Sequence, residues 1–160
     1  MSSKFRFGLM LAIATLVLDQ ATKQWWLSLM AAHPEGIELT PFFNMVMVWN
    51  RGVSFGLFNQ GDGDMQRWVL IAFTSVVVLF LLGWLRRSTK TGVSFGLGLV
   101  TGGAVGNIID RFRFGAVADF LDLHAFGWHW PAFNVADAAI VAGVLLLLAD
   151  ALFQPQTKVR

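Results

Sequence analysis

Hydrophobic residues gather in four long stretches along this chain. The stretches cover residues from about 5 to 30, 68 to 85, 92 to 110 and 132 to 152, and the third is rich in glycine. Each is close to the roughly 20 residues that an α-helix needs to cross a hydrocarbon core. Because lipid offers no hydrogen-bonding partners, a helix that pairs its own backbone groups is the expected spanning structure. The pattern therefore predicts an all-α membrane protein with four transmembrane helices, built as a single integral membrane domain over residues 1–160.

Two long connections, at about 31–67 and 111–131, are expected on one side of the membrane as outer loops. The first contains strand-like composition from Phe42 to Trp49, then a turn at Asn50-Arg51-Gly52, then a candidate returning strand from Val53 to Phe58. Alternating apolar residues bounded by turn residues are typical of a hairpin. We therefore expect a small extracytoplasmic β-sheet in the first outer loop.

Composition agrees with a membrane protein. The chain is 56% hydrophobic and only 14% charged, whereas a soluble domain carries about 25% charged residues. It contains no cysteine, which excludes disulfides, thiolate nucleophiles and cysteine metal sites. The first apolar stretch continues into Trp25-Trp26 without a small-x-small cleavage site, so we expect a retained helix rather than a cleaved leader.

The basic residues predict the orientation of the helices. Seven of them fall on one side if both termini are cytoplasmic: Lys4, Arg6, Arg86, Arg87, Lys90, Lys158 and Arg160. An excess of lysine and arginine marks the cytoplasmic side of a membrane protein. The two long loops then lie on the outer side.

Polar residues inside the apolar stretches share one depth under this topology, near the outer leaflet. They are Asp19, Lys23, Asn107, Asp110, Arg111, Asn134 and Asp137, and Asp119 lies in the loop on the same side. Many of them are spaced three or four residues apart, which places them on one helix face. Ionisable residues in a membrane are costly and usually functional, so the common depth predicts a site there.

Purely structural roles also fit most of these residues. Asp19 and Lys23 fit either an ion pair that ties the first helix into the bundle or a substrate-positioning role. The adjacent charges of Asp110 and Arg111 at a helix end favour a structural role.

Four glycines and three histidines have simpler interpretations. Gly98, Gly102, Gly103 and Gly106 favour close helix packing over ligand binding. His124 and His129 lie near Asp119 and Asp122, but their spacing matches no standard metal-ligand pattern, so we predict no metal site. His33 and Asp150 are expected at the surface without a role.

Asp119 and Asp137 are the candidates for chemistry. Two carboxyl groups that meet separate their pKa values and can share one proton, which suits acid–base catalysis. The alternative is a pair of hydrogen-bonded carboxylates at the membrane interface. The spacing alone does not decide between these interpretations.

Five ordered blocks of residues resemble the signal peptidase II family, also called lipoprotein or prolipoprotein signal peptidases. The blocks are Asp19-Gln20-Ala21-Thr22-Lys23, Asn50-Arg51-Gly52-Val53-Ser54-Phe55, Gly102 to Arg111, Val117-Ala118-Asp119-Phe120, and Phe133-Asn134-Val135-Ala136-Asp137. They cover the whole chain, which makes the resemblance specific. One departure is that Val53-Ser54 replaces two alanines common in the family's second block, which leaves the core assignment intact.

The resemblance implies an aspartyl endopeptidase of the bacterial inner membrane, with its active site near the outer leaflet. Such an enzyme removes signal peptides from diacylglyceryl-modified prolipoproteins and cuts on the amino side of the lipidated cysteine. The catalytic pair carries over to Asp119 and Asp137. Residues that match positions lining or supporting the site are Asp19, Lys23, Asn50, Gly52, Asn107, Arg111 and Asn134.

The resemblance also bears on partners. It implies diacylated prolipoproteins as substrates, contact with membrane lipid, and the inhibitor globomycin. It implies no cofactor, no metal and no nucleic acid.

Other function classes make different predictions. A small proton-coupled transporter subunit needs polar residues through the full depth of the membrane, whereas the inner halves of all four stretches here are apolar. A non-catalytic membrane scaffold predicts that asparagine is tolerated at both aspartates. A presenilin-type protease requires a Gly-x-Gly-Asp element within a helix, and the chain has none.

Overall fold

The computed structural model describes residues 2–30, 32–52 and 63–153. Within these ranges, four helices are long and apolar enough to cross a membrane, as predicted. They are α1 (Ser3–Met30), α2 (Gly63–Arg87), α3 (Thr91–Phe114) and α4 (Val135–Leu152). The predicted strand from Val53 to Phe58, with the Val53-Ser54 departure, and the basic residues Lys158 and Arg160 lie outside the described residues.

The helix ends differ from the limits of the apolar stretches. α2 begins five residues before the predicted position 68, and α3 continues to Phe114 instead of ending near residue 110. Both extensions carry charged side chains, such as Arg67 and Arg113. Hydropathy marks the part of a helix that suits lipid, and helices continue beyond it while their backbone bonds can form. α4 begins later than predicted, at Val135, because Asn134 caps it.

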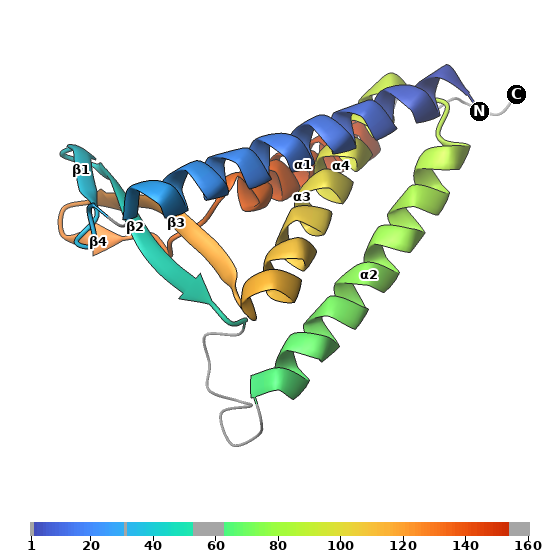
Figure 1. The fold of residues 1–160 in the computed structure, drawn as a ribbon. Helices are drawn as coiled ribbons and strands as arrows, with labels where there is room; N and C mark the ends of the chain where they lie inside the picture. Colours follow the sequence, from blue (N-terminus) through green and yellow to red (C-terminus); the bar gives the residue numbers. More distant parts are fainter. Residues whose placement is uncertain (1, 31, 53–62, 154–160) are drawn as a thin grey trace, which may run out of the picture.

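Helix α3 forms the centre of the bundle, between α1 and α4 and also in contact with α2 (Figure 1). Its glycines make this position possible. A Cβ atom at Gly102 would meet the backbone oxygen of Ala12 in α1, and one at Gly103 would meet that of Ala136 in α4. Small residues let helix backbones approach closely. The packing role predicted for these glycines is therefore confirmed.

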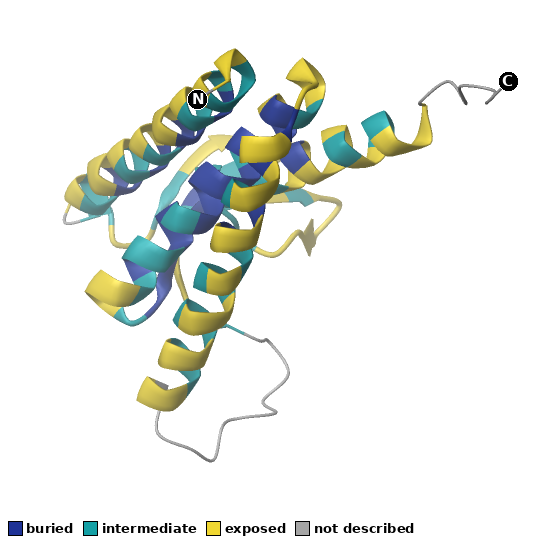
Figure 2. Cartoon of the chain, turned by 90° about the vertical axis from the view of Figure 1, so that its right-hand side faces the viewer, coloured by how far each residue is buried: buried dark blue, intermediate teal, exposed yellow. Residues whose placement is uncertain are grey.

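Helix α2 stands apart from the other three helices. It packs against α3 near the short α2–α3 connection, where Leu81 and Leu85 join Leu97 and Val100 in one apolar cluster. From there it diverges toward its first turn (Figure 1), and much of its surface is exposed, in contrast to α3 (Figure 2). Near the start of α2, Arg67 Nη2 donates to the Phe112 backbone oxygen at 2.6 Å. This contact joins the diverging end of α2 to the end of α3.

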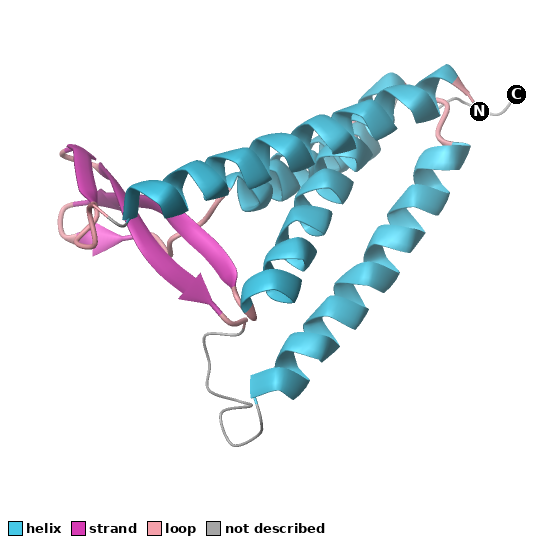
Figure 3. Cartoon of the chain, in the orientation of Figure 1, coloured by secondary structure: helices cyan, strands magenta, loops and turns pink. Residues whose placement is uncertain are grey.

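A four-stranded antiparallel sheet lies at one end of the helices (Figure 3). Its order is β1 (Ile37–Thr40), β2 (Phe43–Asn50), β3 (Val117–Ala125) and β4 (Trp128–His129). The predicted sheet and its strand at Phe42–Trp49 are confirmed, but the sheet is not confined to the first outer loop. β3 and β4 come from the second loop, and β2 pairs with β3. Hydrophobic alternation does not reveal such a long-range pairing.

A buried tryptophan joins the sheet to α1. Trp26, in the last turns of α1, is 0% exposed and packs with Met45 and Phe120 from β2 and β3. Its Nε1 donates to the Val46 backbone oxygen at 2.7 Å. The neighbouring strands pair Asn50 with Val117, near the end of α3. The sheet therefore presents the end of β2 and the start of β3 to the helix bundle.

Candidate active site

Asp137 is held at the start of α4 by a capping box with Asn134. The Asn134 side-chain oxygen accepts from the Asp137 backbone N–H at 2.9 Å. In return, Asp137 Oδ2 accepts from the Asn134 backbone N–H at 3.3 Å. Reciprocal bonds of this kind pair backbone donors that a helix end leaves free. They orient the Asp137 side chain, and the positive end of the helix dipole favours a negative charge there.

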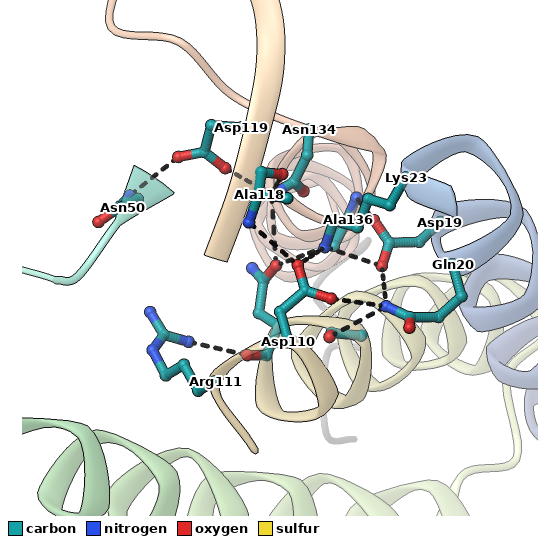
Figure 4. A network of polar contacts seen from close by, with 12 residues as sticks. Asp19, Gln20, Lys23, Asn50, Asp110, Arg111, Ala118, Asp119, Asn134 and Ala136 are labelled. Atoms are coloured by element: carbon teal, nitrogen blue, oxygen red, sulfur yellow. Dashed lines mark hydrogen bonds and ion pairs between the residues drawn. The ribbon is translucent and has the colours of Figure 1, made fainter. Parts of the chain in front are cut away.

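Asp119 lies in β3 with only 1% of its surface exposed. Asn134 Nδ2 donates to its Oδ1 at 2.6 Å, and Asn50 Nδ2 donates to its Oδ2 at 3.0 Å (Figure 4). Each carboxyl oxygen therefore has one amide donor. Because Asn134 also caps the helix through Asp137, a single asparagine joins the two aspartates that the sequence analysis selected.

The surroundings of Asp119 change its acidity. Burial raises the pKa of Asp119 from 3.8 to about 6, and the nearby negative charge of Asp137 acts in the same direction. Hydrogen bonds from Asn50 and Asn134 and the charge of Lys23 oppose the rise. Loss of hydration disfavours a buried carboxylate, whereas donors to the carboxylate favour it. The result is a carboxyl group that can hold a proton close to neutral pH.

Lys23 is the centre of a buried polar cluster beneath the aspartates. Its Nζ lies 3.0 Å from Asp19 Oδ2, 2.8 Å from Asp110 Oδ2 and 3.2 Å from Asn107 Oδ1. An ammonium group has three donors and no acceptor, so three acceptors satisfy it. The ion pair considered for Asp19 and Lys23 is present, and Asp110 shares in it.

The carboxylates of this cluster also bind main-chain groups of other elements. Asp19 Oδ1 accepts from the Ala136 backbone N–H at 3.0 Å, and Asp110 Oδ2 accepts from the Ala118 backbone N–H at 3.1 Å. Ala118 and Ala136 directly precede the two candidate catalytic residues in the chain. The cluster therefore fixes the backbone of β3 next to Asp119 and that of α4 next to Asp137 (Figure 4).

Gln20 belongs to the cluster, although the sequence analysis assigned it no role. Its Nε2 lies 2.9 Å from Asp110 Oδ1, 3.1 Å from Asp19 Oδ2 and 3.3 Å from the Gly106 backbone oxygen. A neutral amide carries no unusual hydropathy signal, and its position between Asp19 and Lys23 was the available clue. The backbone N–H groups of Ala118 and Ala136 could not be selected from the sequence, because an alanine side chain carries no polar group.

Asn107 and Arg111, one helical turn apart in α3, approach the aspartates from a different side. Asn107 Nδ2 donates to Asp137 Oδ1 at 2.8 Å. Arg111 Nη1 donates to the Asn107 backbone oxygen at 3.3 Å, and its buried Nε has no partner among the described atoms. Figure 4 shows the Arg111 guanidinium on the side of α3 away from Lys23. The Arg111 guanidinium therefore lies close enough to both aspartates to interact with their charges.

Gly52 lies at the edge of the site. Its backbone N–H donates to Asn50 Oδ1 at 2.8 Å, so it bears on Asp119 through Asn50. The structure thus connects the nine residues selected from the sequence in one network: Asp19, Lys23, Asn50, Gly52, Asn107, Arg111, Asp119, Asn134 and Asp137.

The histidines lie away from this network, toward the other end of β3. His129 Nδ1 is 2.9 Å from Asp122 Oδ2, and the His129 ring stacks on His124 at 4.8 Å. Across the described ranges, no group of three or more histidine, aspartate or glutamate side chains could hold a metal ion.

The fold and the site together define the class of this protein. A multi-pass helical bundle that holds two aspartates around a shared, buried asparagine has the construction of a membrane aspartic peptidase. The family model described as "Signal peptidase (SPase) II" matches residues 11–153. The chain therefore belongs to the signal peptidase II family.

Individual relatives agree with this assignment. The lipoprotein signal peptidase of Methylorubrum extorquens (strain PA1) is 50% identical over 149 residues, which cover 92% of this chain and 86% of the relative. That of Rhodopseudomonas palustris (strain ATCC BAA-98 / CGA009) is 45% identical over 152 residues, with 92% of each chain covered.

Solved structures match as well. A bacterial membrane enzyme determined by the in meso method at 1.9 Å is similar with a TM-score of 0.77 and 26% identity, covering 92% of this chain and 94% of that one. A second, at 2.3 Å, has a TM-score of 0.73 and 26% identity, covering 96% and 94%. With the family shown, the transporter and scaffold alternatives are not favoured.

Proposed function

We propose that this chain cleaves the signal peptide from prolipoproteins with Asp119 and Asp137 as its catalytic pair. The observation that carries the assignment is the joining of the two aspartates by Asn134, which bonds to both. Carboxyl groups held around one small polar residue can work on the same substrate bond. In its finer form, the proposal is that the substrate carries a diacylglyceryl group on cysteine and is cut on the amino side of that residue.

In this mechanism Asp137 is the ionised partner and Asp119 holds the shared proton. The start of α4 favours negative charge at Asp137, and burial raises the pKa of Asp119 to about 6. Asp137 takes a proton from a water molecule, whose oxygen then attacks the scissile carbonyl carbon. Asp119 donates a hydrogen bond to the carbonyl oxygen, where negative charge develops.

Breakdown of the tetrahedral intermediate completes the reaction. The carbon–nitrogen bond breaks, and the leaving nitrogen, which belongs to the lipidated cysteine, takes a proton from the pair of aspartates. The signal peptide keeps the new carboxyl group, and the proton taken from water is returned to the product. Water is consumed, and no other reactant is needed to balance the step.

The surrounding residues position this pair. Lys23, Asp19 and Asp110 form the buried ionic cluster that fixes the backbones preceding Asp119 and Asp137. The Arg111 guanidinium is partly exposed and interacts electrostatically with Asp137 and Asp119. In the proposal, it binds a backbone carbonyl of the substrate and orients it toward the aspartates.

We also propose that the chain lies in the bacterial inner membrane with both termini in the cytoplasm. Lys4 Nζ donates to Thr91 Oγ1 at 2.6 Å, so the basic start of α1 meets the first residue of α3, close to Lys90 in the α2–α3 connection and to Arg86 and Arg87 in the last turn of α2. Basic residues concentrated at one end of a bundle mark its cytoplasmic side. The sheet and the aspartates then lie near the outer leaflet, where a lipid-anchored substrate can reach them.

The test uses purified enzyme in detergent or lipid with two matched prolipoprotein peptides, one diacylated at cysteine and one not. We expect cleavage of the diacylated peptide, with the new N-terminus at the lipidated cysteine, and inhibition by globomycin. Equal cleavage of both peptides would refute the lipid requirement. Full activity of Asp119→Asn or Asp137→Asn would refute the catalytic assignment.

A further inference from the structure

We propose that Gln66, in the first turns of α2, is a positioning residue that orients the Asn50 amide toward Asp119. The proposal rests on the catalytic role given to Asp119 above. It adds a residue on a further element, α2, which contributes no side chain to the pair or to the ionic cluster among the contacts described. Three hydrogen bonds in series connect Gln66 to the Asp119 carboxyl group.

The Asn50 amide turns its nitrogen toward Asp119 and its oxygen toward Gly52. Asn50 Oδ1 accepts from the Gly52 backbone N–H at 2.8 Å, and Asn50 Nδ2 donates to Asp119 Oδ2 at 3.0 Å. A backbone N–H can donate only to the oxygen of an amide side chain. The Gly52 N–H therefore selects the orientation in which Asn50 offers a donor to Asp119 rather than an acceptor.

The Gly52 N–H belongs to the turn that follows β2. Gly52 has φ +89°, a left-handed conformation that residues with a Cβ rarely adopt. A Cβ at this position would also collide with Leu70 Cδ1 of α2. Gln66 Nε2 donates to the Gly52 backbone oxygen at 2.5 Å. Gln66 and Leu70 lie one helical turn apart, so one face of α2 holds the turn in place.

The start of α2 is itself held by contacts with the end of α3. The diverging start of α2 is joined to α3 by the bond from Arg67 to the Phe112 backbone oxygen and by an edge contact of the Trp68 and Phe112 rings at 5.7 Å. Residues 66 to 68 therefore connect α2 both to the end of α3 and to the turn after β2. A shift of this end of α2 displaces the turn and, through it, the amide of Asn50.

The charged groups that face Asp119 come from other elements and stay in place when Gln66 is changed. They are Lys23 of α1, Arg111 of α3 and Asp137 of α4. The hydrogen bond from Asn50 lowers the pKa of Asp119 against the effect of burial. A misoriented Asn50 amide cannot donate this hydrogen bond. The pKa of Asp119 then rises, and Asp119 keeps its proton to a higher pH. This effect separates positioning from a general loss of stability.

The experiment compares Gln66→Met with wild type and with Met65→Ala. Methionine has nearly the length of glutamine and suits a helix, but it cannot donate to the Gly52 oxygen. Met65 is the exposed neighbour of Gln66 on α2. Each variant is purified in detergent, its melting temperature is measured, and kcat and KM for a diacylated prolipoprotein peptide are followed from pH 5 to 9.

For Gln66→Met, we expect kcat to fall about tenfold, the effect of losing one well-placed hydrogen bond. We expect KM to change by less than about twofold, since mutations that act only on the transition state leave ground-state binding intact. The basic limb of the pH profile should move to higher pH. Met65→Ala should match wild type in all three quantities.

A double variant tests the order of the connection. Asn50→Ala should reproduce the lower kcat and the pH shift, and adding Gln66→Met to Asn50→Ala should cause no further loss, because both act through the same amide. Independent, additive losses would overturn the proposal, and so would a Gln66→Met enzyme with wild-type kcat and pH profile. The proposed function fails separately, if Asp119→Asn retains activity.

Discussion

The side-chain amide of Asn134 donates to Asp119 across 2.6 Å, while the oxygen of the same amide caps α4 at the Asp137 N–H. One residue thus ends a loop, begins a helix and connects a strand residue to a helix residue. Asn134 is itself 0% exposed, so neither bond competes with water. This amide therefore links the two aspartates directly, in addition to the contacts that hold each of them separately.

Replacing either aspartate by asparagine should abolish cleavage without unfolding the protein. Asparagine keeps the size of the side chain but can neither take a proton from water nor supply one to the leaving nitrogen. We expect Asp119→Asn and Asp137→Asn each to lower kcat by at least about 10³-fold, the range of general acid–base and electrostatic contributions combined. Gel-shift cleavage of a diacylated prolipoprotein, with the melting temperature of each variant, provides the measurement.

Variants of Asn134 distinguish its capping of α4 from its hydrogen bond to Asp119. Asn134→Ala should lose both bonds and cost about 1 kcal/mol of stability as a lost cap. Asn134→Ser restores a good capping residue, but its shorter side chain does not reach Asp119. We therefore expect Asn134→Ser to regain most of the melting temperature while kcat stays about 10²-fold below wild type, within the range for mispositioned reacting groups.

Asn44→Ala is the matched control for this series. Asn44 also donates to a carboxylate of β3, Asp122, at 3.2 Å, but toward the other end of the strand. It should leave kcat unchanged. If Asn134→Ser instead regained full activity, the amide bond to Asp119 would have no part in the reaction.

Lys23 should prove structural rather than catalytic. Lys23→Met leaves the carboxylates of Asp19 and Asp110 buried without their counter-ion. Removing one partner of a buried ion pair typically costs about 3–5 kcal/mol, so a large fall in melting temperature is expected. Adding Asp110→Asn to Lys23→Met should recover part of it, because one unpaired charge is then gone. A Lys23→Met protein as stable as wild type would contradict the described cluster.

The acidity of Asp119 predicts how stability depends on pH. Its folded pKa of about 6 exceeds the ordinary value of 3.8, so the folded state binds the proton more tightly than the unfolded state. The stability that comes from this proton is complete below about pH 4 and is lost as the pH rises through about 6. The loss amounts to at most about 3 kcal/mol, from 1.36 kcal/mol for each pKa unit.

Thermal unfolding of wild type and Asp119→Asn between pH 4 and 8 measures this effect. The stability of wild type relative to Asp119→Asn should fall as the pH rises over that window, because asparagine does not titrate. A constant difference between the two proteins would show that Asp119 has an ordinary pKa in the folded state.

The helices and most of the site were predictable from the sequence for one physical reason. Lipid requires long apolar segments, so charged residues such as Asp19, Lys23 and Asp137 stand out against that background. Their i,i+3 and i,i+4 spacing also places them on common faces. The agreement in depth among several segments then predicted one site.

The remaining features depend on contacts between distant parts of the chain. The pairing of β2 with β3 joins two loops separated by two helices, and no local pattern encodes it. Gln20 and Gln66 are neutral, so hydropathy does not distinguish them from ordinary surface residues. The backbone N–H groups of Ala118 and Ala136 reach their acceptors because of the positions of β3 and α4. The side chains of these two residues play no part in these bonds.

The bond from the Ala136 backbone N–H to Asp19 joins residues 117 positions apart in the chain. During synthesis, α1 enters the bilayer long before α4 leaves the ribosome. Asp19 and Lys23 then have only each other until α3 delivers Asp110, and Asp137 is absent until the fourth helix inserts. Under the catalytic assignment proposed above, a nascent chain without α4 lacks half of the catalytic pair, so we expect proteolytic activity only after α4 has inserted.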